Sequence, residues 1–301
     1  MESTSQDFAC AHRWVPTNET VYRLSPRLRW ILLYWFVSII FMDYINTFGY
    51  DRVPMNSPPL PDIGFDAIAK VSGSEAPVSL PFNPTDFATI CICASVILLS
   101  IYEWRTCRNR KLKHLFAIYA ILMNMRTVTI ISTPLPTPYT KGPCRDDHRP
   151  ITNRFLTGLG YAFALGFKQF LSTPQCGDLI FSGHTTFMWI FTLHLLRHAS
   201  ILHSLWRKIA VYIVMSIGAI HIIATRNHYS VDVVLAIIMS SIVHQLFYSS
   251  LQLSYLSKEH GTHWTGQLLL WIDFGGAPPS TGSETAELLD ADGVEMTGVN
   301  S

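Results

Sequence analysis

Long apolar runs separated by polar segments dominate this 301-residue chain. Six of the runs approach the 17–25 residues that a helix needs to cross the hydrocarbon core of a bilayer. They cover Trp30–Phe48, Phe87–Trp104, His114–Thr133, Leu179–Leu196, Ile209–Thr225 and Tyr229–Tyr248. The pattern therefore predicts an all-α, polytopic membrane protein with six transmembrane helices.

The segments between and outside these runs predict one domain with two tails. We expect an N-terminal tail over residues 1–29, a six-helix transmembrane domain over residues 30–248, and a C-terminal tail over residues 249–301. The last tail is rich in polar and turn residues beyond about residue 275, a composition that favours disorder.

Two long loops join the runs on one side. In residues 49–85, the prolines from Pro58 to Pro61 remove backbone donors, so we expect an extended segment and not a helix. In residues 134–177, the apolar stretch Arg154–Leu171 predicts a short interfacial helix or a re-entrant segment. Cys144 and Cys176 lie in this second loop, and the sequence leaves open whether they form a disulfide or remain two free thiols.

Composition agrees with a membrane protein, because 49% of the residues are hydrophobic and only 14% are charged, against about 25% charged in soluble domains. The net charge of +1 indicates no nucleic-acid surface. With a cytosolic N-terminus, 13 of the 22 Lys and Arg residues lie in cytosolic segments and 8 on the other side. This bias predicts that both termini are cytosolic.

Polar and ionisable residues gather where the fourth and sixth runs begin. The fourth follows Cys176-Gly177-Asp178-Leu179-Ile180-Phe181-Ser182-Gly183-His184-Thr185, and the sixth follows His228. Such residues are costly in hydrocarbon and therefore indicate function. The predicted topology puts His184 and His228 at the same membrane face. Asp232, four residues after His228, is expected to fix the tautomer of that ring.

The same face has features that favour a phosphate group. Both helices point their N-termini there, and their free amides and partial positive charge attract anions. Arg126, within the third run, is expected to face this pocket or to pair with Asp178. Two histidines, an aspartate and an arginine suit phosphoryl transfer. We expect no cofactor and no metal, because the ligand spacing matches no zinc framework.

Other histidines within the runs are interpreted as packing residues, since a lone histidine in a membrane helix is usually a hydrogen-bonding interface residue. They are His194, His221 and His244.

Four motifs resemble those of the sphingomyelin synthase family, part of the lipid phosphate phosphatase superfamily. They are Pro58-Pro59-Leu60-Pro61-Asp62; Arg126-Thr127-Val128-Thr129 leading to Thr133-Pro134-Leu135-Pro136; the Cys176–Thr185 segment; and His228-Tyr229-Ser230-Val231-Asp232. They occur in the family's order over about 180 residues. The Thr225-Arg226-Asn227-His228-Tyr229 pattern is also similar to inositol phosphorylceramide synthases.

The resemblance implies an enzyme that moves a phospho-head group (phosphocholine, phosphoethanolamine or phosphoinositol) from a glycerophospholipid to the primary hydroxyl of ceramide and releases diacylglycerol. It implies that His228 is the nucleophile of a phosphohistidine intermediate, oriented by Asp232, and that His184 is the general acid and base. Substrate-binding roles fall to Arg126, Asp178, Ser182 and Tyr229.

The partners implied are ceramide, the donor lipid and the bilayer, and a homo-oligomer stays open. The resemblance places the chain in the Golgi or plasma membrane, with the site on the lumenal or extracellular side. Two other functions stay open: a lipid phosphate phosphatase that uses the same histidines, and a non-catalytic lipid-binding protein.

Overall fold

A computed structural model describes residues 26–54, 56–74, 76–78, 80, 83–104, 110–139, 144, 151–164, 176, 179–199, 204–256 and 264–273. Secondary structure in these residues is helical, without strands, which confirms the all-α class. The helices are α2 (Pro26–Tyr50), α3 (Ile63–Ser72), α4 (Pro84–Trp104), α5 (Arg110–Ser132), α7 (Arg154–Ala164), α8 (Gly183–His198), α9 (Leu205–Ala224), α10 (Ser230–Leu256) and α11 (Trp264–Asp273). Each of the six predicted runs overlaps one helix.

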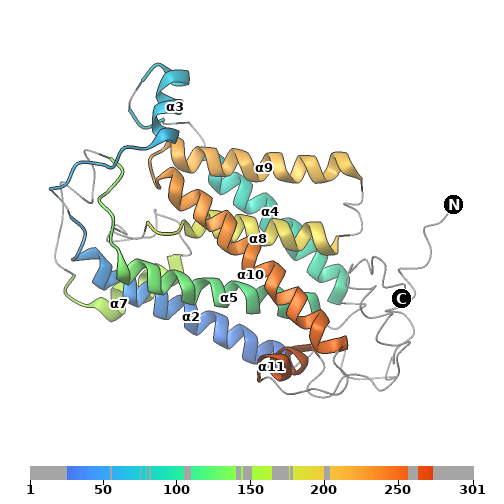
Figure 1. Cartoon of the computed structure of the whole chain (residues 1–301). Coiled ribbons are helices and arrows are strands. Elements are labelled where there is room, and N and C mark those ends of the chain that lie inside the picture. The colour runs from blue at the N-terminus through green and yellow to red at the C-terminus, as the bar shows by residue number, and fades with distance from the viewer. Residues whose placement is uncertain are drawn as a thin grey trace.

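The long helices form a bundle in which α8 contacts α4, α5, α9 and α10 (Figure 1). Helix α2 packs on α5 along one side, and α4 packs on α9 along another. The short helix α3 lies at one end of the bundle, next to the end of α9 and the start of α10, whereas α11 lies against α10 at the opposite end (Figure 1). The start of α10 is therefore enclosed by α3, α8 and α9.

Four helices are long and apolar enough to cross a membrane within the described residues: Arg27–Tyr50, Lys111–Ser132, Leu205–Ala224 and Ser230–Ser254. Large apolar side chains on α2, α4, α9 and α10 are exposed, as lipid contact requires. The described apolar part of α4 is shorter, Pro84–Leu98, and α8 has only 16 residues. An integral membrane protein is thus supported, while the six-span count and the cytosolic termini stay predictions.

The expectation of an extended, non-helical loop over residues 49–85 is wrong in part, because α3 forms within it. Residues 56–62 are non-helical, as the prolines require. Immediately afterwards, the Asp62 carboxylate accepts hydrogen bonds from the amides of Gly64 and Phe65 and so caps α3. Gly73, in the left-handed conformation at φ 69°, ends the helix.

Helix α7 lies within the predicted apolar stretch of the second loop and packs closely on α2. A Cβ atom on Gly158 would lie 2.8 Å from the Cα of Tyr44, so only glycine permits this approach. Arg154 donates to the carbonyl of Thr47 at 2.7 Å and pairs with Asp51. A short helix therefore forms in this stretch, held on α2 at the same end of the bundle as α3.

The second loop also contains a disulfide between Cys144 and Cys176, which resolves the alternative left open by the sequence. Both cysteines are buried in a small cluster with Tyr50 and Val53, at the end of α2. The described residues include two free cysteines, Cys91 and Cys93, and both lie in α4.

The predicted boundary of the transmembrane domain at residue 248 falls inside α10, which continues to Leu256. Helix α11 then packs on α10 and α5, and the Lys113 ammonium group donates to the carbonyl of Ile272 at 2.7 Å. Residues 1–25, and the region beyond residue 275 that we expect to be disordered, lie outside the described residues.

Candidate active site at the starts of α8 and α10

The start of α10 is fixed by a carboxylate inside its own first turn. Tyr229 precedes the helix, and its backbone amide donates to Oδ2 of Asp232 at 2.9 Å. This is one half of a capping box, in which the third helical residue reaches back to the capping residue. Asp232 is completely buried. The residue just before this cap is His228.

His228 is 7% exposed, and its ring is held at the Nδ1 atom. Nδ1 lies 3.2 Å from the carbonyl oxygen of Leu179 and 3.6 Å from Oδ2 of Asp232. We expected Asp232 to fix the tautomer of this ring, but His228 lies outside α10 and the Leu179 carbonyl is the nearer partner of Nδ1. A carbonyl can only accept, so Nδ1 carries the hydrogen and Nε2 keeps a lone pair.

Helix α8 begins next to this ring. Ser182 is its N-cap, and the Ser182 hydroxyl accepts hydrogen bonds from the amide and the hydroxyl of Thr185, at 3.4 and 3.0 Å. The Ser182 amide donates to the backbone carbonyl of Asp232 at 3.2 Å. His184 is the second residue of α8 and is half-buried. His184 and His228 therefore lie at the starts of α8 and α10, which the hydrogen bond between Ser182 and Asp232 joins.

Arg126 reaches the same place from α5. A Cβ atom on Gly183 would lie 1.9 Å from the Arg126 Nη1 atom, so the guanidinium occupies the space that any other side chain would fill. Arg126 is 6% exposed and also contacts the sulfur of Met42 at 3.9 Å. One turn further along α5, the Thr129 hydroxyl donates to the carbonyl of Ile180 at 2.6 Å. The guanidinium is thus placed beside the first turn of α8. Asp178, its other expected partner, lies outside the described residues.

The expectation that both helix N-termini offer free amides to a phosphate needs correction at α10. The amide of Ser230 donates to Asp62 at 2.7 Å, and the amide of Tyr229 donates to Asp232. Those donors are already satisfied by carboxylates that also neutralise the local positive potential. A phosphate would therefore meet the N-terminus of α8 and the guanidinium of Arg126.

Two residues connect the first and second sequence motifs to this site. The Tyr229 hydroxyl donates to the carbonyl of Pro136 and accepts from the amide of Leu60, both at 3.0 Å. Asp62 caps α3 and α10 together, because its carboxylate also accepts from the Ser230 hydroxyl at 2.6 Å. Sequence reasoning missed this role of Asp62, although an aspartate before a helical apolar pattern is a recognisable cap signal.

The histidines that we interpreted as packing residues contact side chains of the bundle: His194 and His221 are buried, and His244 is half-buried. His221 lies near the end of α9, with Nδ1 2.9 Å from the Thr85 hydroxyl. His194 packs against His198, and His244 packs against Tyr248, toward the other end of the bundle. Within the part of the chain that the structure describes, no group of three or more His, Cys, Asp or Glu side chains is arranged to hold a metal ion.

Comparison with known proteins matches the chain to one group of enzymes. A family model described as PAP2 superfamily C-terminal matches residues 175–250, which contain both histidines. The chain is 28% identical over 271 residues to "Putative phosphatidylcholine:ceramide cholinephosphotransferase 3" of Caenorhabditis elegans, covering 85% of this chain and 75% of that protein. It is 26% identical over 215 residues to phosphatidylcholine:ceramide cholinephosphotransferase 2 of Rattus norvegicus, covering 68% and 54%.

A third relative is sphingomyelin synthase-related protein 1 of Mus musculus, 27% identical over 226 residues and covering 71% of this chain and 44% of that protein. The match thus spans about half the length of the last two relatives and three quarters of the first. The chain is therefore similar to the phosphatidylcholine:ceramide cholinephosphotransferases, and its residues 175–250 match the PAP2 superfamily C-terminal model.

Proposed function

We propose that this protein transfers a phospho-head group from a glycerophospholipid to the primary hydroxyl of ceramide and releases diacylglycerol. The observation that carries the proposal is the His228 ring, fixed at Nδ1 by the Leu179 carbonyl at 3.2 Å beside the helix start that holds His184. A ring fixed in this way has one basic nitrogen, Nε2. The start of α8, which is bonded to α10 through Ser182 and Asp232, supplies the second imidazole, that of His184. The names of the relatives supply the two lipid classes.

In the first step, Nε2 of His228 attacks the phosphorus of the donor lipid. The bond between phosphorus and the diacylglycerol oxygen breaks, and protonated His184 gives its proton to that oxygen. The product is a phosphohistidine that carries the head group. The Asp232 carboxylate, 3.6 Å from Nδ1, stabilises the positive charge that the ring of His228 gains.

In the second step, His184 acts as a base. It takes the proton of the ceramide primary hydroxyl, the hydroxyl oxygen attacks the phosphorus, and the bond between phosphorus and Nε2 breaks. The enzyme returns to its starting protonation state, because the proton lost by His184 in the first step is regained here. One histidine thus serves as acid and then as base.

The negative charge on the phosphoryl oxygens would be held by Arg126 and by the amides at the start of α8. The close contact between the guanidinium and Gly183 supports this role, because it directs a permanent positive charge to the residue before His184. Asp178 and Ser182 stay proposed substrate-binding residues. Tyr229 is 1% exposed and its hydroxyl joins two loops, which supports a positioning role better than direct substrate contact.

We further propose that the reaction takes place on the lumenal or extracellular side of the Golgi or plasma membrane. The excess of Lys and Arg in the segments at the other end supports this orientation.

The proposal is tested with membranes from cells that lack their own ceramide phosphotransferases. The membranes receive a fluorescent ceramide and glycerophospholipids with choline, ethanolamine and inositol head groups, and the products are separated by chromatography. The wild-type chain should form a fluorescent phosphosphingolipid. His184→Ala and His228→Ala should each reduce its rate by at least about a hundredfold, because each removes a proton-transfer or nucleophilic role.

His221→Gln is the matched control, since His221 is another buried histidine at the same end of the bundle, and its ring contacts the Thr85 hydroxyl of α4. It should keep the activity of the wild type. Undiminished product with His228→Ala would overturn the proposed mechanism. Release of the free phospho-head group without any ceramide product would instead establish a hydrolase that uses water as the acceptor, and release of inorganic phosphate from a lipid phosphate would establish a phosphatase.

A further inference from the structure

The turn between α9 and α10 contains an arginine in a conformation that arginine rarely adopts. Arg226 has φ 53°, in the left-handed region. Its amide donates to Ile223, and the amide of Asn227 donates to Ile222, at 2.9 and 3.1 Å. These two bonds form a Schellman motif, whose left-handed position is usually glycine. A residue with a Cβ atom costs about 1 kcal/mol more there, so the backbone gains nothing from arginine.

The side chain of Arg226 lies over an aromatic ring near the candidate active site. Its guanidinium carbon lies 4.8 Å from the centre of the Phe65 ring, a distance typical of a cation–π interaction. The Phe65 ring in turn lies 5.6 Å from the ring of Tyr229 and belongs to the same buried cluster as Leu179, whose carbonyl holds His228. Arg226 therefore lies two residues before His228, the proposed nucleophile. Its side chain contacts Phe65, which belongs to the buried cluster that contains Leu179.

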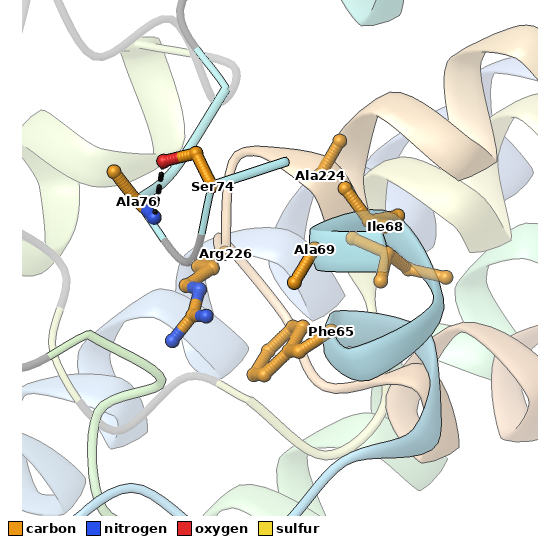
Figure 2. A pocket seen from close by; sticks show the side chains of 8 residues that line it. Phe65, Ile68, Ala69, Ser74, Ala76, Ala224 and Arg226 are labelled. Atoms are coloured by element: carbon orange, nitrogen blue, oxygen red, sulfur yellow. Dashed lines mark hydrogen bonds between the residues drawn. The ribbon is translucent and has the colours of Figure 1, made fainter. Parts of the chain in front are cut away.

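Arg226 and Phe65 also line a small open pocket between α3 and the end of α9 (Figure 2). The remaining lining is small or apolar: Ile68, Ala69, Ser74, Ala76, Ile223 and Ala224. Arg226 is therefore the one ionisable side chain among the described lining residues, and it is partly exposed.

In the proposed mechanism, the phosphorus of the donor lipid lies at Nε2 of His228, immediately before α10. Its acyl chains would then lie among the apolar helices. Its head group would extend toward the turn of residues 225–228, beside which α3 packs against α9 and α10. The side chains there include Arg226 and Phe65.

We propose that Arg226 selects the head group of the donor lipid, favouring head groups rich in oxygen acceptors over those with a quaternary ammonium. This inference rests on the proposed function. A guanidinium donates up to five hydrogen bonds to hydroxyl or anionic oxygens. It repels a fixed positive charge, and it already covers the Phe65 face on which a quaternary ammonium would be bound.

The experiment offers the enzyme equal amounts of three donors, with inositol, ethanolamine or choline head groups, together with fluorescent ceramide. The ratio of phosphoinositol to phosphocholine product is measured. The wild type should favour the inositol donor, and Arg226→Gly should shift the ratio toward choline by about tenfold or more. Because glycine suits the left-handed position, this variant should melt no lower than the wild type.

Two further variants separate this effect from a change in bulk charge. Lys70→Gln removes a positive charge from the exposed face of α3 and should leave the ratio unchanged. Arg226→Gly combined with Phe65→Leu should lose the gain in choline transfer, because the exposed ring is then missing. An unchanged product ratio in Arg226→Gly, with product still formed, overturns this inference alone. Absence of any product from all donors in the wild type overturns the proposed function as well.

Discussion

Gly183 shows how much of the candidate site depends on the absence of one side chain. It separates the cap residue of α8 from His184, and the Arg126 guanidinium fills the space where its Cβ atom would be. Ser182, His184 and the Arg126 guanidinium are therefore neighbours of a residue that has no side chain. A methyl group there must displace a buried cation, since a separation of 1.9 Å is not compatible with contact.

We expect Gly183→Ala to reduce transferase activity by about a hundredfold, the effect of displacing a catalytic group by about 1 Å. The measurement is the rate of ceramide conversion at saturating lipid. Gly160→Ala is the matched control, because Gly160 also lies in a helix but a Cβ atom there meets nothing within 4 Å. That variant should keep full activity. Full activity of Gly183→Ala would mean that Arg126 does not act from its present position.

At the scale of elements, one carboxylate joins two helix N-termini. Asp62 accepts from two amides of α3 and from the amide and hydroxyl of Ser230 in α10. The partial positive charges of both helices therefore meet the same negative group. This arrangement transmits the position of α3 to the turn that carries His228.

Asp62→Ala should lower the free energy of unfolding by about 2–3 kcal/mol, since each lost cap costs about 1 kcal/mol and the Ser230 hydroxyl loses its partner. The apparent melting temperature in detergent should fall, and activity should fall with it. Asp66→Ala removes an exposed carboxylate from the first turn of the same helix and should change the melting temperature little. Equal melting temperatures for the two variants would contradict the double cap.

The disulfide between Cys144 and Cys176 joins the segments before and after α7, with a sequence separation of 32 residues. In the chain-entropy view, closing such a loop contributes about 3–4 kcal/mol. Replacing both cysteines by alanine should lower the apparent melting temperature, and reductant should lower that of the wild type but not of the variant. After proteolysis within the loop, the two fragments should separate only on a reducing gel. Fragments that separate without reductant would show that the bond is absent.

At the scale of the whole molecule, the apolar runs predict the bundle because hydrocarbon leaves helices few alternatives. Each predicted run coincides with a helix, and the two histidines lie at bonded helix starts. The partners of His228 were not predictable in the same way. The Leu179 carbonyl is a backbone group, and every residue except proline has the same backbone groups, so sequence gives no sign of which one will bind.

The misjudged loop has a different cause. The prolines before Asp62 correctly predict a non-helical segment, but we extended that reading beyond them. Proline restricts itself and the residue before it, not the residues that follow. From Asp62 onward, a cap residue and an apolar pattern indicate a helix, and α3 forms there.

The orientation of the bundle in the membrane is the remaining whole-molecule prediction. Ser204 precedes α9, and its side chain makes no capping bond. Ser74 is exposed and lies near the other end of the same helix, where Val78 bonds to Ala224. If α9 crosses the bilayer, these serines lie on opposite sides. The excess of Lys and Arg favours a cytosolic position for the Ser204 end of α9. In sealed vesicles with the cytosolic face outward, an impermeant maleimide should therefore label Ser204→Cys at once. It should label Ser74→Cys only after the vesicles are permeabilised. The reverse order would place the candidate site in the cytosol, and ceramide would then have to be modified on that face.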